Sequence, residues 1–289
     1  MKILIAGAGG VGGYYGGMLA KAGHDVFFVA RGAHLDAMAK NGLTVKSING
    51  DFTIPVKCGE DGRAFGVADL VIVCVKSYDT ASTTDLYKMN VGAQTAILSL
   101  QNGIDNETVL AGAFGEKALI GGISFIGSRV EKPGVVLHTA FGHISIGELF
   151  DVVSDRILTI ADAFAKASVK CRTSENIKRD IYGKMVWNVG FNAICTILDC
   201  DARTLLLFDE TKNLVKSAME EWIKVAVADG VDLTHDMANR NVEITLKGGE
   251  VIPSMLVDRR KGRKMEIDTF NGKVVELGKK YKIPTPVNA

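Results

Sequence analysis

Residues 2–12 read Lys-Ile-Leu-Ile-Ala-Gly-Ala-Gly-Gly-Val-Gly, an apolar run of strand type that passes directly into glycines. Small residues continue as far as Ala22 and predict a helix, so the glycines lie between a strand and a helix. In such a G-x-G-x-x-G loop, the first glycine permits a tight turn and the second lets the backbone approach a pyrophosphate. Glycine is frequent in this chain (32 of 289 residues), so a helix that packs through small residues is the alternative. We predict a dinucleotide-binding loop made of Gly7, Ala8, Gly9, Gly10, Val11 and Gly12.

Short apolar runs alternate with helical patterns through the first half of the chain. This alternation is typical of a parallel sheet whose strands are buried on both faces by crossover helices. Further on, apolar residues spaced by twos around Gly142 predict an antiparallel hairpin that closes the sheet. The strand-like runs are Lys2–Ala6, Asp25–Val29, Leu70–Val75, Thr95–Leu98 and Ala118–Ile123, and the hairpin residues are Val135, Leu137, Ile144 and Ile146.

After the strand-like segment Val169–Arg172 the pattern becomes helical from about residue 174, where Ser174 is suited to cap a helix N-terminus. We therefore predict an α/β protein with two domains. Residues 1–173 would form a Rossmann-type parallel sheet that binds the nucleotide, and residues 174–289 an all-helical domain for substrate and catalysis.

Composition and charge exclude several classes of protein. The 34 Lys and Arg residues nearly balance the 33 Asp and Glu residues, so no basic surplus is available for nucleic acid. The chain has no apolar run long enough to span a membrane. An odd number of cysteines without a Cys-x-x-Cys pair predicts reduced thiols in the cytoplasm rather than disulfides or a zinc site. No metal site is expected, and the scattered histidines are interpreted as surface or strand residues: His24, His34, His138, His143 and His235.

Polar residues follow the predicted strands where the cofactor would lie. Arg31 comes just after the second strand, where an acidic residue would favour NAD(H) and an arginine favours the 2′-phosphate of NADP(H). The alternative is a solvated charge at the start of the next helix. Lys76 and Asn102 end the next two strands, at the edge where open α/β sheets bind ligands, although either could simply begin a loop.

A polar stripe marks the most informative helix of the second half. Lys184, Asn188 and Asn192 are spaced i, i+4, i+8 and share one face of an otherwise apolar helix. Partial burial would lower the pKa of the lysine, which suits a general acid near neutrality. The alternative is a polar contact between helices, with Lys184 reaching solvent. Further on, Ser254 could cap a helix, and Glu266 could either bind a substrate hydroxyl or face solvent.

Taken together, these motifs resemble the 2-dehydropantoate 2-reductase (ketopantoate reductase) family along essentially the whole chain. The resemblance rests on the glycine loop, Ala-Arg-Gly, Val-Lys-Ser, Gln-Asn-Gly, Lys-x3-Asn-x3-Asn, Ser-Met-Leu-x-Asp and Glu-Ile-Asp-x-x-Asn-Gly. It implies NADPH-dependent reduction of 2-dehydropantoate to pantoate in the cytoplasm, on the way to pantothenate and coenzyme A.

The resemblance also implies roles for single residues. The loop Gly7 to Gly12 and Arg31 would bind NADPH, with Lys76 and Asn102 beside the nicotinamide and ribose and Asn102 also near the substrate. Lys184 would be the proton donor, and Glu266 would assist catalysis by holding the substrate hydroxyl. Asn188, Asn192 and Ser254 would complete the substrate site.

The chain departs from the family pattern in two places. Trp187 stands within the stripe where the family usually has a smaller residue, and we expect the family's closing helix to be missing after Ala289. Two alternatives remain. The protein could reduce another 2-oxo acid on the same fold, or it could be a non-catalytic NADPH-sensing protein. Lys184 argues against the second alternative, because a sensor has no need of a proton donor. The expected partner is a small 2-oxo acid, and the sequence is compatible with a homodimer.

Overall fold

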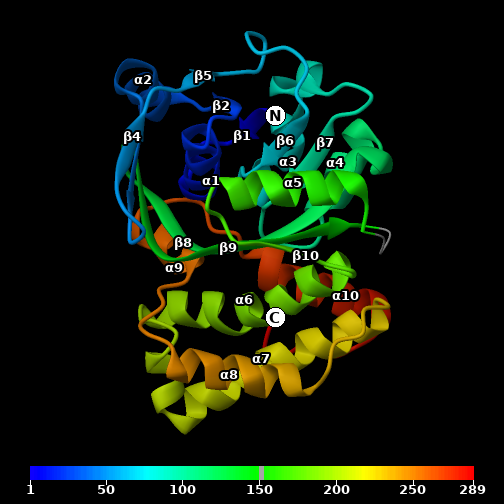
Figure 1. Cartoon of the computed structure of the whole chain (residues 1–289). Coiled ribbons are helices and arrows are strands. Elements are labelled where there is room, and N and C mark those ends of the chain that lie inside the picture. Colours follow the sequence, from blue (N-terminus) through cyan, green and yellow to red (C-terminus); the bar gives the residue numbers. More distant parts are fainter. Residues whose placement is uncertain (150–152) are drawn as a thin grey trace. The chain divides into compact units, whose positions relative to one another are not determined.

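In the computed structural model, which describes residues 1–149 and 153–289, the chain divides into two units (Figure 1). These are Met1–Ile177 and Lys178–Ala289. The N-terminal unit contains a ten-stranded sheet with its covering helices. The regular elements of the C-terminal unit are helices.

The central strands of the sheet are parallel and follow the order β5-β2-β1-β6-β7-β8. Counted along the chain, this is the 3-2-1-4-5-6 order of a dinucleotide-binding Rossmann sheet, so the predicted fold class is confirmed. The order reverses beside β1, and the glycine loop follows β1 at that point. The strands are β1 (Lys2–Ala6), β2 (Asp25–Val29), β5 (Lys57–Gly59), β6 (Leu70–Val73), β7 (Ala96–Ser99) and β8 (Leu119–Lys132).

The hairpin that closes the sheet differs from its prediction. β8 pairs antiparallel with β9 (Val135–Glu148), and the two strands join at Pro133-Gly134, where Gly134 has φ +75°. Gly142, the expected centre, instead lies inside β9. The Pro-Gly pair is a stronger turn signal than a single glycine within alternating residues, because it supplies both a fixed φ and a left-handed position.

Short strands extend the sheet beyond the runs given above. β3 (Leu43–Ser47) pairs parallel with β9, and β4 (Phe52–Ile54) pairs antiparallel with β3. β10 (Cys171–Thr173) pairs parallel with β9. β3, β4 and β5 were not predicted from the sequence, whereas β10 overlaps the strand-like segment Val169–Arg172. The sequences of these strands are short and only partly apolar, so their strand conformation depends on the neighbouring strands.

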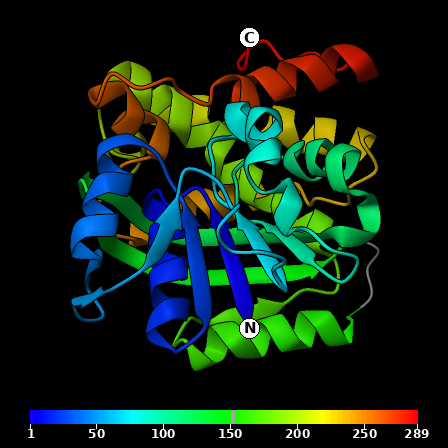
Figure 2. The same cartoon turned by 90° about the horizontal axis from the view of Figure 1, so that it is seen from above.

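Alternate residues of β1 pack into two separate apolar clusters, one on each face of the sheet. Ile3 and Ile5 join the cluster that contains α1 (Gly10–Lys21) and α5 (Asp155–Lys166). Leu4 and Ala6 join the other cluster, which includes residues of α4 (Asn106–Phe114). Figure 2 shows α5 and α4 on opposite sides of the strands. Burial on both faces explains why β1 is a continuous apolar run. The other helices of this unit are α2 (Gly32–Asn41) and α3 (Thr80–Thr83).

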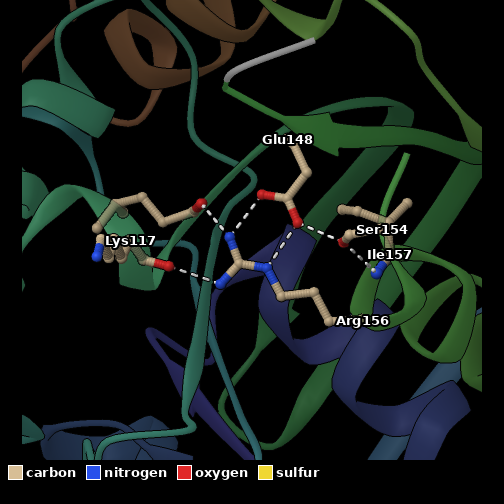
Figure 3. Close-up of polar contacts among 6 residues, drawn as sticks. Lys117, Glu148, Ser154, Arg156 and Ile157 are labelled. Atoms are coloured by element: carbon tan, nitrogen blue, oxygen red, sulfur yellow. Dashed lines mark hydrogen bonds and ion pairs between the residues drawn. The ribbon is translucent and has the colours of Figure 1, made fainter. Parts of the chain in front are cut away.

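An ion pair connects the end of β9 to the start of α5 (Figure 3). Arg156 donates from Nε to Glu148 Oε1 at 2.6 Å and from Nη2 to Oε2 at 2.5 Å. It also donates to the backbone carbonyl of Lys117, and Ser154 Oγ donates to Glu148 Oε1. Burial alone would raise the pKa of Glu148, but the hydrogen bonds and charge of Arg156 and the Ser154 hydrogen bond hold it below its usual range.

The C-terminal unit packs around the apolar sides of α6 and α7. Trp222 is fully buried, donates from Nε1 to the Tyr182 carbonyl at 3.0 Å and stacks on the Tyr182 ring. The helix predicted from Ser174 begins at Ile177 instead, and Ser174 Oγ accepts from the Asn176 amide. The elements are α6 (Ile177–Leu198), α7 (Asp209–Ala228), α8 (Asp236–Lys247), α9 (Ser254–Arg260), a π-helix (Asp268–Gly272) and α10 (Lys273–Tyr281).

Candidate functional site

The glycine loop has the geometry that a close backbone approach requires. Gly7 has φ +100°, and the amides of Gly7 and Ala8 both donate to Val29 O at 3.2 Å, which ties the loop to the end of β2. A Cβ on Gly12 would lie 2.1 Å from Gly7 O, whereas a Cβ on Gly9 would meet no atom within 4 Å. The chain therefore packs tightly at Gly12 and leaves open space at Gly9, as a ligand-binding loop needs.

Gly10 has a structural reason to be glycine. A Cβ at this position would lie 2.6 Å from Ser128 O, so the start of α1 packs directly on the backbone of β8. Since a backbone atom cannot give way as a flexible side chain can, Gly10 is required by this contact whether or not a ligand is bound.

Arg31 lies at the N-terminus of α2 with 89% of its side chain exposed. Its guanidinium is 3.6 Å from the carboxylate of Asp79, which belongs to the segment after β6. An exposed ion pair of this length contributes about 0–1 kcal/mol. An ion pair this weak would not prevent Arg31 from turning to a phosphate.

A polar network supports Lys76 and Asn102, which follow β6 and β7. Gln101 donates to Val75 O at 2.9 Å and to Thr80 Oγ1 at 2.8 Å. Asn106 donates to the Asn102 carbonyl at 2.7 Å and accepts from the Thr80 hydroxyl. These bonds join the two strand ends. The prediction from sequence missed Gln101, although its place within Gln-Asn-Gly was a signal.

Glu107 stands in the first turn of α4, directly after Asn106 of this network. Burial raises its pKa to about 7, while hydrogen bonds from its own backbone and from Ser99 oppose the shift. Sequence reasoning gave no signal for Glu107, because an acidic residue in a first helical turn is common.

In the second unit, the predicted stripe lies on α6. Asn188 is 7% exposed and Asn192 is fully buried. Burial lowers the pKa of Lys184 to about 8, and the nearby carboxylate of Glu266 opposes that shift by favouring the ammonium form. Glu266 itself is 5% exposed. An ammonium group of this pKa can both donate and recover a proton near neutral pH, as a general acid must.

Asn192 uses its amide group to connect three of the predicted residues. Its Oδ1 accepts from the Met255 amide at 3.2 Å and from Ser254 Oγ at 3.4 Å. Its Nδ2 donates to Asn188 at the carbonyl (3.1 Å) and at Oδ1 (3.3 Å). Asn192 thus places Ser254 and Asn188 beside each other. The stripe, Ser254 and Glu266 lie in the second unit, whereas Arg31, Lys76, Asn102 and the glycine loop lie in the first.

All five cysteines are free thiols, and residues 1–149 and 153–289 contain no group of three or more His, Cys, Asp or Glu side chains placed to hold a metal. Within the same residues, no helix has both the length and the apolar character needed to cross a membrane.

Two family models match this chain, and both describe ketopantoate reductase. The family described as ketopantoate reductase PanE/ApbA matches residues 3–150, and the one described as ketopantoate reductase PanE/ApbA C terminal matches residues 176–289. A 2-dehydropantoate 2-reductase of Pyrococcus abyssi (strain GE5 / Orsay) is 32% identical over 291 residues, covering 100% of this chain and 94% of the relative.

Solved structures agree with the family matches. The crystal structure of 2-dehydropantoate 2-reductase from Geobacter metallireducens GS-15 has a TM-score of 0.94 at 38% identity, covering 100% of this chain and 96% of that chain. A ternary structure of D-mandelate dehydrogenase with NADH and anilino(oxo)acetate has a TM-score of 0.94 at 26% identity, covering 100% of this chain and 95% of that one. The resemblance inferred from the motifs is confirmed.

Proposed function

Because the chain belongs to the ketopantoate reductase PanE/ApbA family of oxidoreductases, we propose that it reduces 2-dehydropantoate to pantoate with NADPH. The observation that carries this proposal is Lys184, a lysine whose pKa burial lowers to about 8 next to the buried carboxylate of Glu266. A sensor that only binds a nucleotide has no need of such a proton donor.

The residues of each unit suit separate parts of this reaction. In the proposed nucleotide-binding domain, residues 1–173, the glycine loop would hold the pyrophosphate, Arg31 the 2′-phosphate, and Lys76 and Asn102 the nicotinamide end. The open space at Gly9 and the tight packing at Gly12 fit a dinucleotide there. When bound, NADPH supplies the hydride for the C2 ketone.

In the proposed substrate domain, residues 174–289, Lys184 donates a proton to the ketone oxygen as negative charge develops on it. Asn188 and Ser254 provide donors for the carboxylate of the 2-oxo acid. Glu266 accepts a hydrogen bond from the substrate hydroxyl and supports the charged form of Lys184. Asn192 acts mainly by holding Ser254 and Asn188 in place.

The direct test is NADPH oxidation by the purified protein, followed through the loss of near-ultraviolet absorbance with 2-dehydropantoate present. We expect turnover with kcat/KM higher for 2-dehydropantoate than for other 2-oxo acids. Tight NADPH binding without turnover on any 2-oxo acid would instead identify a sensor protein.

One alternative has a specific observation behind it. The D-mandelate dehydrogenase structure superposes over the whole chain with a TM-score of 0.94. If benzoylformate, the 2-oxo acid that corresponds to mandelate, gives the higher kcat/KM, and NADH serves better than NADPH, this chain is a dehydrogenase of aromatic 2-hydroxy acids.

The cofactor preference is tested separately with Arg31→Ala. This change should weaken NADPH binding by about 10- to 100-fold, because charge-assisted bonds to a phosphate contribute about 1.5–3 kcal/mol. Binding of NADH should stay nearly the same, since NADH lacks the 2′-phosphate. Quenching of protein fluorescence gives the Kd for each dinucleotide and so tests whether Arg31 favours NADPH.

Asp79→Asn is the matched control, because it removes the ion-pair partner of Arg31 but leaves the guanidinium. NADPH should bind to this variant at least as tightly as to the wild type. If Arg31→Ala weakens the binding of NADPH and of NADH by a similar factor, Arg31 does not interact with the 2′-phosphate.

A further inference from the structure

His34 connects two separate segments of the first unit through its imidazole ring. Its Nε2 lies 2.8 Å from the carbonyl oxygen of Ala8 in the glycine loop, and its Nδ1 accepts from the Gly134 amide at 3.1 Å. A carbonyl can only accept and an amide N–H can only donate, so Nε2 carries the proton and the ring is neutral. From the sequence alone, His34 was interpreted as a surface or strand residue, whereas it lies in α2 and is part-buried.

The bond to Ala8 controls the orientation of one peptide group. The amides of Gly7 and Ala8 are held by Val29 O, and the next peptide group joins Ala8 to Gly9. A trans peptide is planar, with its C=O and N–H pointing in opposite directions. Since His34 holds the Ala8 carbonyl, the Gly9 N–H must point away from the imidazole. Gly9, the residue before α1, has the backbone freedom to let this peptide flip if the bond is lost.

We propose that His34 is a positioning residue for dinucleotide binding: by holding the Ala8 carbonyl, it makes the loop present the Gly9 N–H, not a carbonyl, to the pyrophosphate. This proposal rests on the proposed function, in which the loop binds the dinucleotide. An anion is attracted by an N–H dipole and repelled by a carbonyl oxygen, so a flipped peptide would weaken binding. Burial lowers the pKa of His34, which keeps the ring in the neutral form that this arrangement needs.

The two ring nitrogens can be separated by conservative variants. In His34→Gln, the amide nitrogen can take the place of Nε2 and donate to Ala8. In His34→Asn, the amide oxygen can take the place of Nδ1 and accept from Gly134, but nothing reaches Ala8. His34→Ala removes both bonds. Asp36→Ala, at an exposed position of the same helix, controls for changes in α2 itself.

The experiment measures Kd for NADPH and for NADH, together with Tm, for the wild type and the four variants. We expect His34→Ala and His34→Asn to bind both dinucleotides about 5- to 30-fold more weakly, because a part-buried carbonyl loses its donor. His34→Gln and Asp36→Ala should stay within about twofold of the wild type. Rescue by Gln but not by Asn is the result that a general packing role would not produce.

Other outcomes overturn the proposal. If Asn restores binding and Gln does not, the contact with Gly134 is the important one. If the three His34 variants bind equally well, or are equally weak, the donor to Ala8 has no special role. The Gln and Asn variants remain informative should His34→Ala fail to fold. A wild-type protein that binds neither dinucleotide would reject the proposed function itself, whereas wild-type binding with unaffected variants rejects only the role of His34.

Discussion

Lys184→Ala should lower kcat for 2-oxo acid reduction by about 10²–10⁴-fold, the usual contribution of a positioned general acid. This corresponds to about 3–5 kcal/mol of transition-state stabilisation. The Kd for NADPH should change little, because Lys184 lies in the helical unit and is proposed to act on the substrate oxygen. Steady-state kinetics combined with fluorescence titration of NADPH measure the two effects separately.

The pH dependence provides a second readout of Lys184. The donor must be the ammonium form, and its pKa is about 8. The rate should therefore be nearly constant below pH 8 and fall as the pH rises above it, because deprotonation removes the acid. Lys184→Arg keeps the charge, and its guanidinium stays protonated throughout this pH range, so its low activity should show no fall near pH 8.

Lys178→Ala is the matched control for this helix. Lys178 is exposed on α6 and lies 5.7 Å from the centre of the Tyr182 ring. Its removal should leave kcat close to that of the wild type. If Lys178→Ala and Lys184→Ala reduce kcat equally, or if Lys184→Ala weakens NADPH binding as much as it reduces kcat, Lys184 has a structural role.

The second large effect concerns the ion pair of Glu148 and Arg156. Arg156→Ala should lower the free energy of unfolding by about 3 kcal/mol, because it leaves a buried carboxylate without its cation. We expect the lower end of the usual range, since 35% of the Arg156 side chain is exposed while Glu148 retains only 9%. Urea unfolding followed by circular dichroism gives this difference.

An exposed pair on the same helix is the matched control. Lys166 lies 2.7 Å from Asp162 on α5, and both side chains are mostly exposed. Lys166→Ala should cost about 0.3–0.5 kcal/mol. Equal losses in the two variants would show that burial of Glu148 adds nothing to the strength of its ion pair.

The pH dependence of this stabilisation has a definite sign. The pKa of Glu148 is lowered in the folded protein, so the unfolded chain takes up the proton more readily in acid. The stabilisation is complete above the ordinary carboxyl pKa and is lost as the pH falls through the lowered value. The unfolding free energies of the wild type and Arg156→Ala should therefore approach each other at low pH.

The sequence predicted correctly those strands and helices whose pattern lies within a single element. The strand runs Lys2–Ala6 and Asp25–Val29 occur with their predicted bounds, and the stripe on α6 has the predicted helical spacing. Both patterns follow from the period of one element and from which of its faces is buried. The Pro133-Gly134 turn was equally local and was overlooked. The short strands β3, β4 and β5 were missed because their conformation depends on the segments that pair with them.

Local pattern thus accounts for the order of the elements, the glycine loop at the end of β1 and the shared face of Lys184, Asn188 and Asn192. Tertiary structure decided which partners those residues meet. Asn192 reaches Met255, and His34 connects Ala8 to Gly134, across separations that no periodicity encodes. The pKa of Lys184 is likewise a tertiary property, because it depends on how much water the packed chain excludes and on the carboxylate brought beside it.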